Sequence, residues 1–162
     1  MKTLIILRHG KAELYAIGLE DYDRALTSRG VRNASEMGKY ILKKEGTPDF
    51  VLSSSANRAY QTAVLASQGL NFPVKEITAD ETLYLVSEYR LVKALSELPA
   101  TVNYCLLVGH NPGLTDMVNY FGVRLDNLPT ASAVCFTFQA DNWENISSYK
   151  AEFQWIKLAR EL

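Results

Sequence analysis

The chain contains only two histidines, and each follows a short apolar run. His9 comes directly after Arg8 at the end of the first run, and His110 follows a later run. A second arginine, Arg58, lies shortly after an apolar segment that ends in three serines. Imidazole can act as a nucleophile, and guanidinium groups bind phosphate oxygens in pairs. These residue types together indicate phosphoryl chemistry.

The segments Leu4–Leu7, Asp49–Leu52 and Tyr104–Val108 are short and mostly apolar, which is typical of buried strands. Ligands of open α/β sheets bind at the carboxyl ends of the strands, so both histidines and both arginines should meet there. Either histidine alone would more commonly be a hydrogen-bonded structural group, and it is the combination that indicates a site. No acidic run lies nearby to neutralise the arginines, so the site should attract an anion.

Several neighbouring features favour a neutral, nucleophilic His9. Helix starts after Ser55 and Pro112 would add amide donors for an anion. The nearby cationic groups should lower the imidazole pKa. Gly10 allows a backbone carbonyl to hold the second ring nitrogen. There is no phosphate-binding glycine loop and no cluster with metal-ligand spacing, so we expect chemistry without a metal or a cofactor.

The alternation of strands and helices predicts an α/β fold of one domain, residues 1–162. Six strands are predicted, over residues 4–7, 49–52, 74–77, 104–108, 133–138 and 149–156. Four helices are predicted, over residues 28–44, 56–67, 87–98 and from Pro112 to Gly122. The first should be capped by Thr27 or Ser28 and the second by the serine cluster. The expected architecture is a three-layer α/β/α sandwich with a mainly parallel sheet and an antiparallel edge.

Bulk composition narrows the function classes. The 162 residues are 48% apolar and 22% charged, with a net charge of −1, so no general attraction to nucleic acid or membrane is expected. Thr3–Leu7 is too short for a secretion signal, and no run approaches a membrane span. Cys105 and Cys135 lie in apolar runs and should be reduced, inert thiols. We expect a cytoplasmic monomer.

Four motifs together resemble those of the histidine phosphatase superfamily, which has the phosphoglycerate mutase-like fold. Leu7–Gly10 resembles its Arg-His-Gly signature, and Arg58–Ala63 its Arg-Ala-x-Gln-Thr-Ala element. Gly109–Pro112 resembles the second histidine motif. Asp23–Gly30 matches the stretch Asp-Arg-Pro-Leu-Thr-x-x-Gly, with alanine in place of the usual proline. The motifs follow the family order and extend over about two-thirds of the chain.

The resemblance is strongest to the short bacterial phosphohistidine phosphatases of the SixA type. It implies that His9 attacks phosphorus and is transiently phosphorylated, and that Arg8, Arg58 and His110 hold the phosphoryl oxygens. Two further residues, Arg24 and Asn111, are candidate substrate contacts. Ser55 stands where the family often has proline, which we interpret as a change in the turn.

Members of this family that cleave esters place an acidic residue near the pocket to protonate the leaving oxygen. Asp80 and Glu81 follow the third predicted strand, and Glu81 is the candidate proton donor, although a solvated loop carboxylate is an equally good interpretation. A phosphohistidine substrate would relax this requirement, because a protonated imidazole leaves easily.

The short connection from Pro73 to Ser87 leaves only the loop 11–26 as a sizeable lid, so the site should be open. An open site suits phosphohistidine on a protein, such as a phosphorelay carrier domain. Two alternatives remain open. One is a phosphatase or mutase for a small phosphate ester, and the other is a non-catalytic module that binds a phosphorylated partner.

Overall fold

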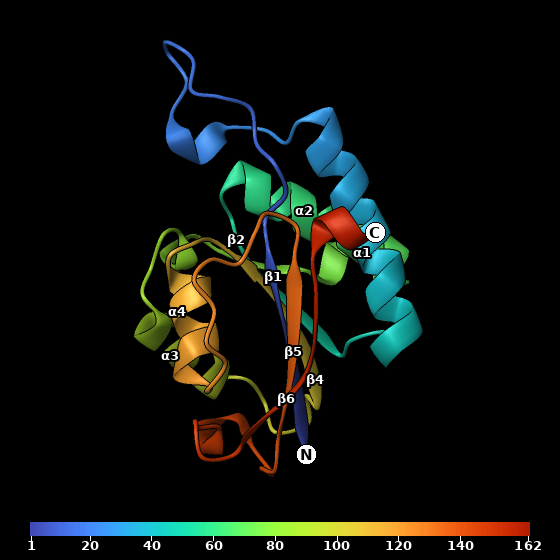
Figure 1. Cartoon of the computed structure of the whole chain (residues 1–162), viewed down its shortest axis with the longest axis vertical. Coiled ribbons are helices and arrows are strands. Elements are labelled where there is room, and N and C mark those ends of the chain that lie inside the picture. The colour runs from blue at the N-terminus through green and yellow to red at the C-terminus, as the bar shows by residue number, and fades with distance from the viewer.

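A computed structural model describes all residues, 1–162, and contains one six-stranded sheet in the order β3-β2-β4-β1-β5-β6 (Figure 1). The strands are β1 Lys2–Arg8, β2 Phe50–Ser54, β3 Thr78–Asp80, β4 Tyr104–Gly109, β5 Ala133–Phe138 and β6 Ala151–Lys157. Strands β1 to β4 pair in parallel, whereas β5 and β6 are antiparallel to their neighbours. The predicted mainly parallel sheet with an antiparallel edge is confirmed.

Helices cover both faces of this sheet. They are α1 Ser28–Glu45, α2 Asn57–Gly69, α3 Glu88–Ser96 and α4 Gly113–Tyr120. Helices α1 and α2 pack against each other on one face, and α3 and α4 lie together on the other (Figure 1). The structure is therefore the predicted three-layer sandwich. None of its helices has the length and apolar character needed to cross a membrane.

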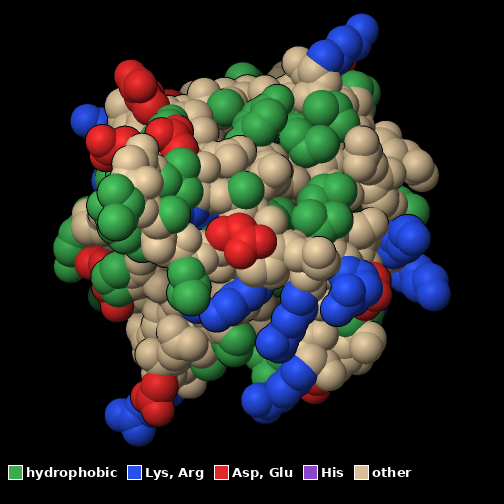
Figure 2. All heavy atoms as spheres, turned by 90° about the horizontal axis from the view of Figure 1, so that it is seen from above, with side chains coloured by type: hydrophobic (Ala, Val, Ile, Leu, Met, Phe, Trp, Pro, Cys, Tyr) green, Lys and Arg blue, Asp and Glu red, His purple; other side chains and the backbone are tan.

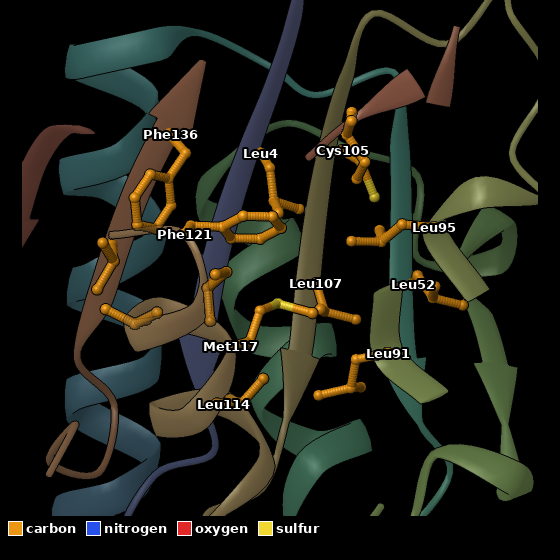
Figure 3. Close-up of a cluster of buried hydrophobic side chains, with 14 of the residues drawn as sticks. Leu4, Leu52, Leu91, Leu95, Cys105, Leu107, Leu114, Met117, Phe121 and Phe136 are labelled. Carbon is orange, nitrogen blue, oxygen red and sulfur yellow. The ribbon is translucent and has the colours of Figure 1, made fainter. Parts of the chain in front are cut away.

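Strand β1 is buried on both faces, which explains its continuous apolar sequence. Leu4 and Ile6 belong to a cluster of 20 buried residues shared with α3 and α4. Ile5 and Leu7 belong to a second cluster of 14 buried residues, shared with α1 and α2. Figure 3 shows part of the first cluster, where side chains of α3 and α4 meet those of the sheet. This packing fixes the end of β1 on both sides.

Close contact between α1 and α2 depends on a glycine. A Cβ atom at Gly38 would collide with the carbonyl oxygen of Ala66 on the facing helix. The hydrogen atom of glycine therefore allows the two helix backbones to approach. Thr27 caps α1, since its side chain accepts a hydrogen bond from the Gly30 amide at 3.0 Å.

The prediction of a third strand at 74–77 is wrong. Val74–Glu76 forms a 3-10 turn after Pro73, and the strand is the next segment, Thr78–Asp80, which pairs with Leu52–Ser54. Because β3 is a short edge strand with exposed residues, it lacks the apolar run that marks a buried strand.

The last strand also differs from its predicted pattern. Tyr149 begins the predicted strand 149–156, but it is 98% exposed and precedes the first residue of β6. Phe153 is also exposed, and the register with β5 shifts between Cys135 and Phe136. This irregularity interrupts the regular alternation of inward-facing and outward-facing side chains along β6.

Candidate active site

The two histidines lie side by side because their strands are neighbours. In the parallel pair of β1 and β4, Arg8 is aligned with Gly109, so His9 and His110 leave the sheet together. The His9 amide donates a hydrogen bond to the Gly109 carbonyl at 3.1 Å. The two ring centroids are 5.2 Å apart. With Arg8 and Arg58, the histidines form what we call the strand-end cluster.

The ring of His9 is held in a defined orientation. Its Nδ1 atom lies 2.7 Å from the carbonyl oxygen of Gly10, so Nδ1–H donates and Nε2 keeps its lone pair. Burial lowers the pKa of His9 most strongly, and Arg8, Arg58 and Arg24 lower it further, to about 4, although the bond to Gly10 acts in the opposite direction. The imidazole is therefore neutral near pH 7, with Nε2 free to attack.

Gly10 is in turn fixed by both helices of one face. Its amide donates to the Thr62 hydroxyl at 3.0 Å, and that hydroxyl donates to the Arg58 carbonyl at 2.8 Å within α2. A Cβ atom on Gly10 would lie only 2.9 Å from the Gly30 carbonyl oxygen at the start of α1. These contacts place the carbonyl that orients His9.

His110 is held by the end of β2. Its Nε2 atom lies 2.9 Å from the Ser54 hydroxyl, whereas its Nδ1 atom is buried without a partner. Burial first, and then the neighbouring His9 and Arg58, lower the pKa of His110 to about 3. The prediction that the serine cluster caps α2 is wrong, because the N-cap of that helix is Ala56, without a side-chain bond. Ser54 instead supports a site residue.

Arg8 is anchored by the loop between α4 and β5. Its Nη1 atom donates to the Leu128 carbonyl at 3.0 Å, and its buried Nε has no partner. The same carbonyl accepts a hydrogen bond from the Asn111 side-chain amide at 2.9 Å. The side-chain oxygen of Asn111 accepts bonds from Thr115. Asn111 therefore supports the acceptor of Arg8, and its direct contact with substrate stays a prediction.

Arg58 is 3% exposed and binds an acidic residue that the sequence had not assigned to the site. Its Nη1 donates to the Asp21 backbone carbonyl at 2.8 Å, and its Nη2 to the Asp21 carboxylate at 3.1 Å. Arg24 donates to the other carboxylate oxygen at 2.9 Å. The structure thus brings the predicted Arg24 next to Arg58, through Asp21.

Tyr84 completes this arrangement. Its hydroxyl donates to the Asp21 carboxylate, and its ring meets His110 edge-on, with centroids 5.4 Å apart. The hydrogen bond from Tyr84 is the main cause that lowers the pKa of Asp21, to about 2, and Arg58 adds to it although partial burial opposes the shift. Asp21 is therefore a carboxylate at neutral pH.

Glu81 occupies a different kind of position. It is exposed at the start of the 3-10 turn Glu81–Leu83, and its side chain makes no hydrogen bond or ion pair. Tyr84, directly after this turn, reaches the strand-end cluster instead. The role of Glu81 as proton donor stays a prediction.

The site has no enclosed cavity. Of the four cavities in the molecule, none is lined by a member of the strand-end cluster, and the largest, about 340 Å³, lies between α1 and the chain end. Figure 2 looks down on the molecule from the end where β1 finishes. Acidic and basic side chains lie close together on this face, and no histidine is visible.

Sequence comparison gives a family match and several relatives. Residues 4–84, half of the chain, match the sequence model of the histidine phosphatase superfamily (branch 1). An uncharacterized protein of Mycobacterium tuberculosis is 34% identical over 106 residues, which cover 65% of this chain and 63% of that protein. An uncharacterized protein of Mycobacterium leprae is 27% identical over 159 residues, which cover 90% of this chain and 95% of that protein. The match thus covers less than two-thirds of the M. tuberculosis relative.

Solved structures give the same architecture. The protein histidine phosphatase SixA in complex with tungstate superimposes with a TM-score of 0.82 at 23% identity, over 98% of this chain and 97% of that one. A structure assigned as a phosphohistidine phosphatase SixA from Nakamurella multipartitia superimposes with a TM-score of 0.83 at 23% identity, over 96% of this chain and 95% of that one. At 23% sequence identity, the similarity to these two structures shows only that the fold is shared.

Proposed function

Because the chain belongs to the histidine phosphatase superfamily, we propose that it removes phosphoryl groups through a covalent intermediate on His9. The observation that carries this proposal is the orientation of the His9 ring. Nδ1 is bound to the Gly10 carbonyl, so Nε2 is the only ring nitrogen free to attack, and it belongs to a cluster with two guanidinium groups.

In the first step, the lone pair of Nε2 attacks phosphorus, and the bond from phosphorus to the leaving group breaks. Arg8, Arg58 and His110 bind the phosphoryl oxygens, and Arg24 adds positive charge. In the second step, water attacks phosphorus, phosphate is released, and His9 becomes neutral again with its proton still on Nδ1. The same groups stabilise the charge that develops on the oxygens in both steps.

Three buried atoms of the cluster support this assignment of roles. Arg8 Nε, Arg58 Nε and His110 Nδ1 have no hydrogen-bond partner. Such buried polar atoms normally have one, and a phosphoryl group supplies acceptor oxygens. If the Ser54 hydroxyl donates to His110 Nε2, then Nδ1 carries the proton and is also a donor.

We propose phosphohistidine on a protein, such as a phosphorelay carrier domain, as the substrate. Two observations favour it over a small ester. No cavity adjoins the strand-end cluster, so the protein offers no pocket shaped to enclose a small leaving group. Proteins named SixA, described as phosphohistidine phosphatases, share the fold. Independence of metal ions is part of the proposal.

The test compares phosphate release from a histidine-phosphorylated carrier domain with release from a panel of small phosphate esters. Both assays contain a chelator and are repeated with His9→Asn. Fast turnover of the carrier, slow turnover of esters and loss of both in the variant are expected. A labelled phosphoryl group should be trapped on the wild-type protein as acid-labile phosphohistidine, and not on His9→Asn.

Preference for one ester would replace the proposed substrate with a small molecule. Anion binding without phosphate release from any substrate would refute catalysis and support a phosphate-binding module. Activity that is lost with the chelator and restored by a metal ion would refute the metal-free mechanism.

A further inference from the structure

Asp21 is the one acidic side chain that is hydrogen-bonded to the strand-end cluster. Arg58, Arg24 and Tyr84 all donate to its carboxylate. The proposed mechanism gives this carboxylate no task. An anion beside a phosphate-binding arginine would weaken the attraction for phosphate, so its presence requires a reason.

The position of Asp21 relative to His9 suggests what it contacts. The His9 residue is 7% exposed, whereas the Asp21 side chain is 44% exposed. In a displacement at phosphorus, the leaving group departs in line, on the side opposite the nucleophile. Since His9 attacks from the buried side, the leaving group lies toward solvent. Asp21 is the more exposed of the two residues and is bonded to Arg58, which holds the phosphoryl oxygens in the proposed mechanism, so we place it on that outer side.

We propose that Asp21 selects phosphohistidine over phosphate esters by accepting a hydrogen bond from the protonated ring of the leaving imidazole. This inference rests on the proposed function, since it concerns the same site. A carboxylate stabilises a cationic ring and disfavours a leaving group that departs as an anion. The residue thus acts through the charge of the leaving group.

The step balances without any proton donor. The substrate ring carries phosphorus on one nitrogen and a proton on the other. When His9 Nε2 bonds to phosphorus, the electron pair of the broken P–N bond returns to the substrate ring. That ring leaves neutral and keeps its proton, which faces Asp21. The positive charge now lies on the His9 ring, whose Nδ1–H remains on the Gly10 carbonyl.

The charge state of Asp21 agrees with this role. The hydrogen bond from Tyr84 and the nearby Arg58 hold its pKa at about 2, so the carboxylate has no proton to give at neutral pH. An alkoxide leaving group needs such a proton. The same side chain that fits a protonated imidazole is therefore unsuited to cleavage of alkyl phosphates.

The test uses two small substrates, phosphoimidazole with a P–N bond and p-nitrophenyl phosphate with a P–O bond. Asp21→Asn should lower kcat/KM for phosphoimidazole by about 10- to 100-fold, the effect expected when a hydrogen bond to a charged group is lost. It should leave kcat/KM for p-nitrophenyl phosphate unchanged or raise it. Asn keeps one side-chain oxygen, which can accept from Arg58, and the backbone bond from Arg58 to residue 21 is unaffected. Only Arg24 then loses its side-chain acceptor.

The matched control is Asp23→Asn, in the same 3-10 turn. Asp23 is exposed and its carboxylate makes no hydrogen bond, so both substrates should be turned over as by the wild type. A second readout is the pH profile. The alkaline decline of phosphoimidazole turnover should move to lower pH in Asp21→Asn, because the protonated substrate is no longer stabilised, while the profile for p-nitrophenyl phosphate stays in place.

Equal losses on both substrates, with no shift in the pH profile, would show that Asp21 only positions Arg58, and would overturn the inference while leaving the phosphatase intact. Wild-type protein that cleaves only p-nitrophenyl phosphate would overturn both this inference and the proposed substrate. Wild-type protein that cleaves neither substrate, nor the phosphorylated carrier, would refute the proposed function itself.

Discussion

Thr62 offers a sharp test of how His9 is held. Its side chain is fully buried and stands between two parts of the site. Its hydroxyl accepts the hydrogen bond of the Gly10 amide at 3.0 Å and donates to the Arg58 carbonyl at 2.8 Å. Thr62→Val has nearly the same shape and removes only the hydroxyl. The substitution therefore isolates these two hydrogen bonds.

The expected loss of stability follows from the Gly10 amide. In Thr62→Val this buried N–H loses its acceptor, which should lower the free energy of unfolding by about 1–3 kcal/mol. The bond to the Arg58 carbonyl adds little, because that carbonyl already belongs to the ladder of α2. The Gly10 backbone should also shift, which misplaces the carbonyl that orients His9. We expect kcat to fall by on the order of 10- to 100-fold.

Thr62→Ser is the matched control. It keeps the hydroxyl and loses one methyl group, so it should lose about 1 kcal/mol of stability from the smaller buried surface and keep most of its activity. Urea denaturation at pH 7 measures stability, and steady-state kinetics on one phosphorylated substrate measures kcat. If Thr62→Val keeps wild-type kcat while Thr62→Ser loses it, the link from α2 through Gly10 to His9 is refuted.

Three further predictions concern pH and single residues. Both histidines have lowered pKa values in the fold, about 4 for His9 and about 3 for His110, against 6.5 in the unfolded chain. The unfolded state therefore binds more protons than the folded state below pH 6.5. The free energy of unfolding should fall from pH 6.5 toward pH 4 by about 1 kcal/mol per pH unit for each histidine. Equal free energies of unfolding in urea titrations at pH 7 and pH 5 would contradict this prediction. Glu81→Gln should slow hydrolysis of alkyl phosphates but spare phosphoimidazole, and equal large losses in kcat/KM on both would refute its role as an acid needed only for esters. Lys2 is 1% exposed, and its Nζ donates hydrogen bonds to three oxygens of residues 100–103. Lys2→Met should therefore lower the free energy of unfolding, measured by urea denaturation, by about 2–4 kcal/mol. A variant as stable as the wild type would show that these hydrogen bonds do not stabilise the fold.

The convergence of the two histidines could be predicted from the sequence. Each follows a continuous apolar run, and a run of that kind is typical of a parallel strand covered on both faces. Parallel strands end at the same edge of a sheet, so residues that follow them meet there. Arg58 could be placed because a helix directly follows β2. This inference needed no knowledge of which strands are neighbours.

Asp21 and Tyr84 could not be placed in the same way. Asp21 belongs to a polar loop whose path depends on contacts with Arg58, 37 residues away along the chain. The spacing of three between Asp21 and Arg24 indicates an ion pair, but not that a third partner joins it. Tyr84 follows a short 3-10 turn that has no periodic signal. Prediction of the third strand four residues too early also obscured the direction of this segment.

The pairing of β1 has a consequence for biosynthesis. Of the six strands this one is made first, yet both strands beside it, β4 and β5, are made much later, at residues 104–109 and 133–138. While the ribosome produces the intervening chain, the apolar segment 2–8 has no partner and is open to aggregation or to a chaperone. His9 and His110 cannot meet until β4 has emerged. The proposed phosphatase activity, measured on a nascent chain, would therefore report that β4 has paired with β1.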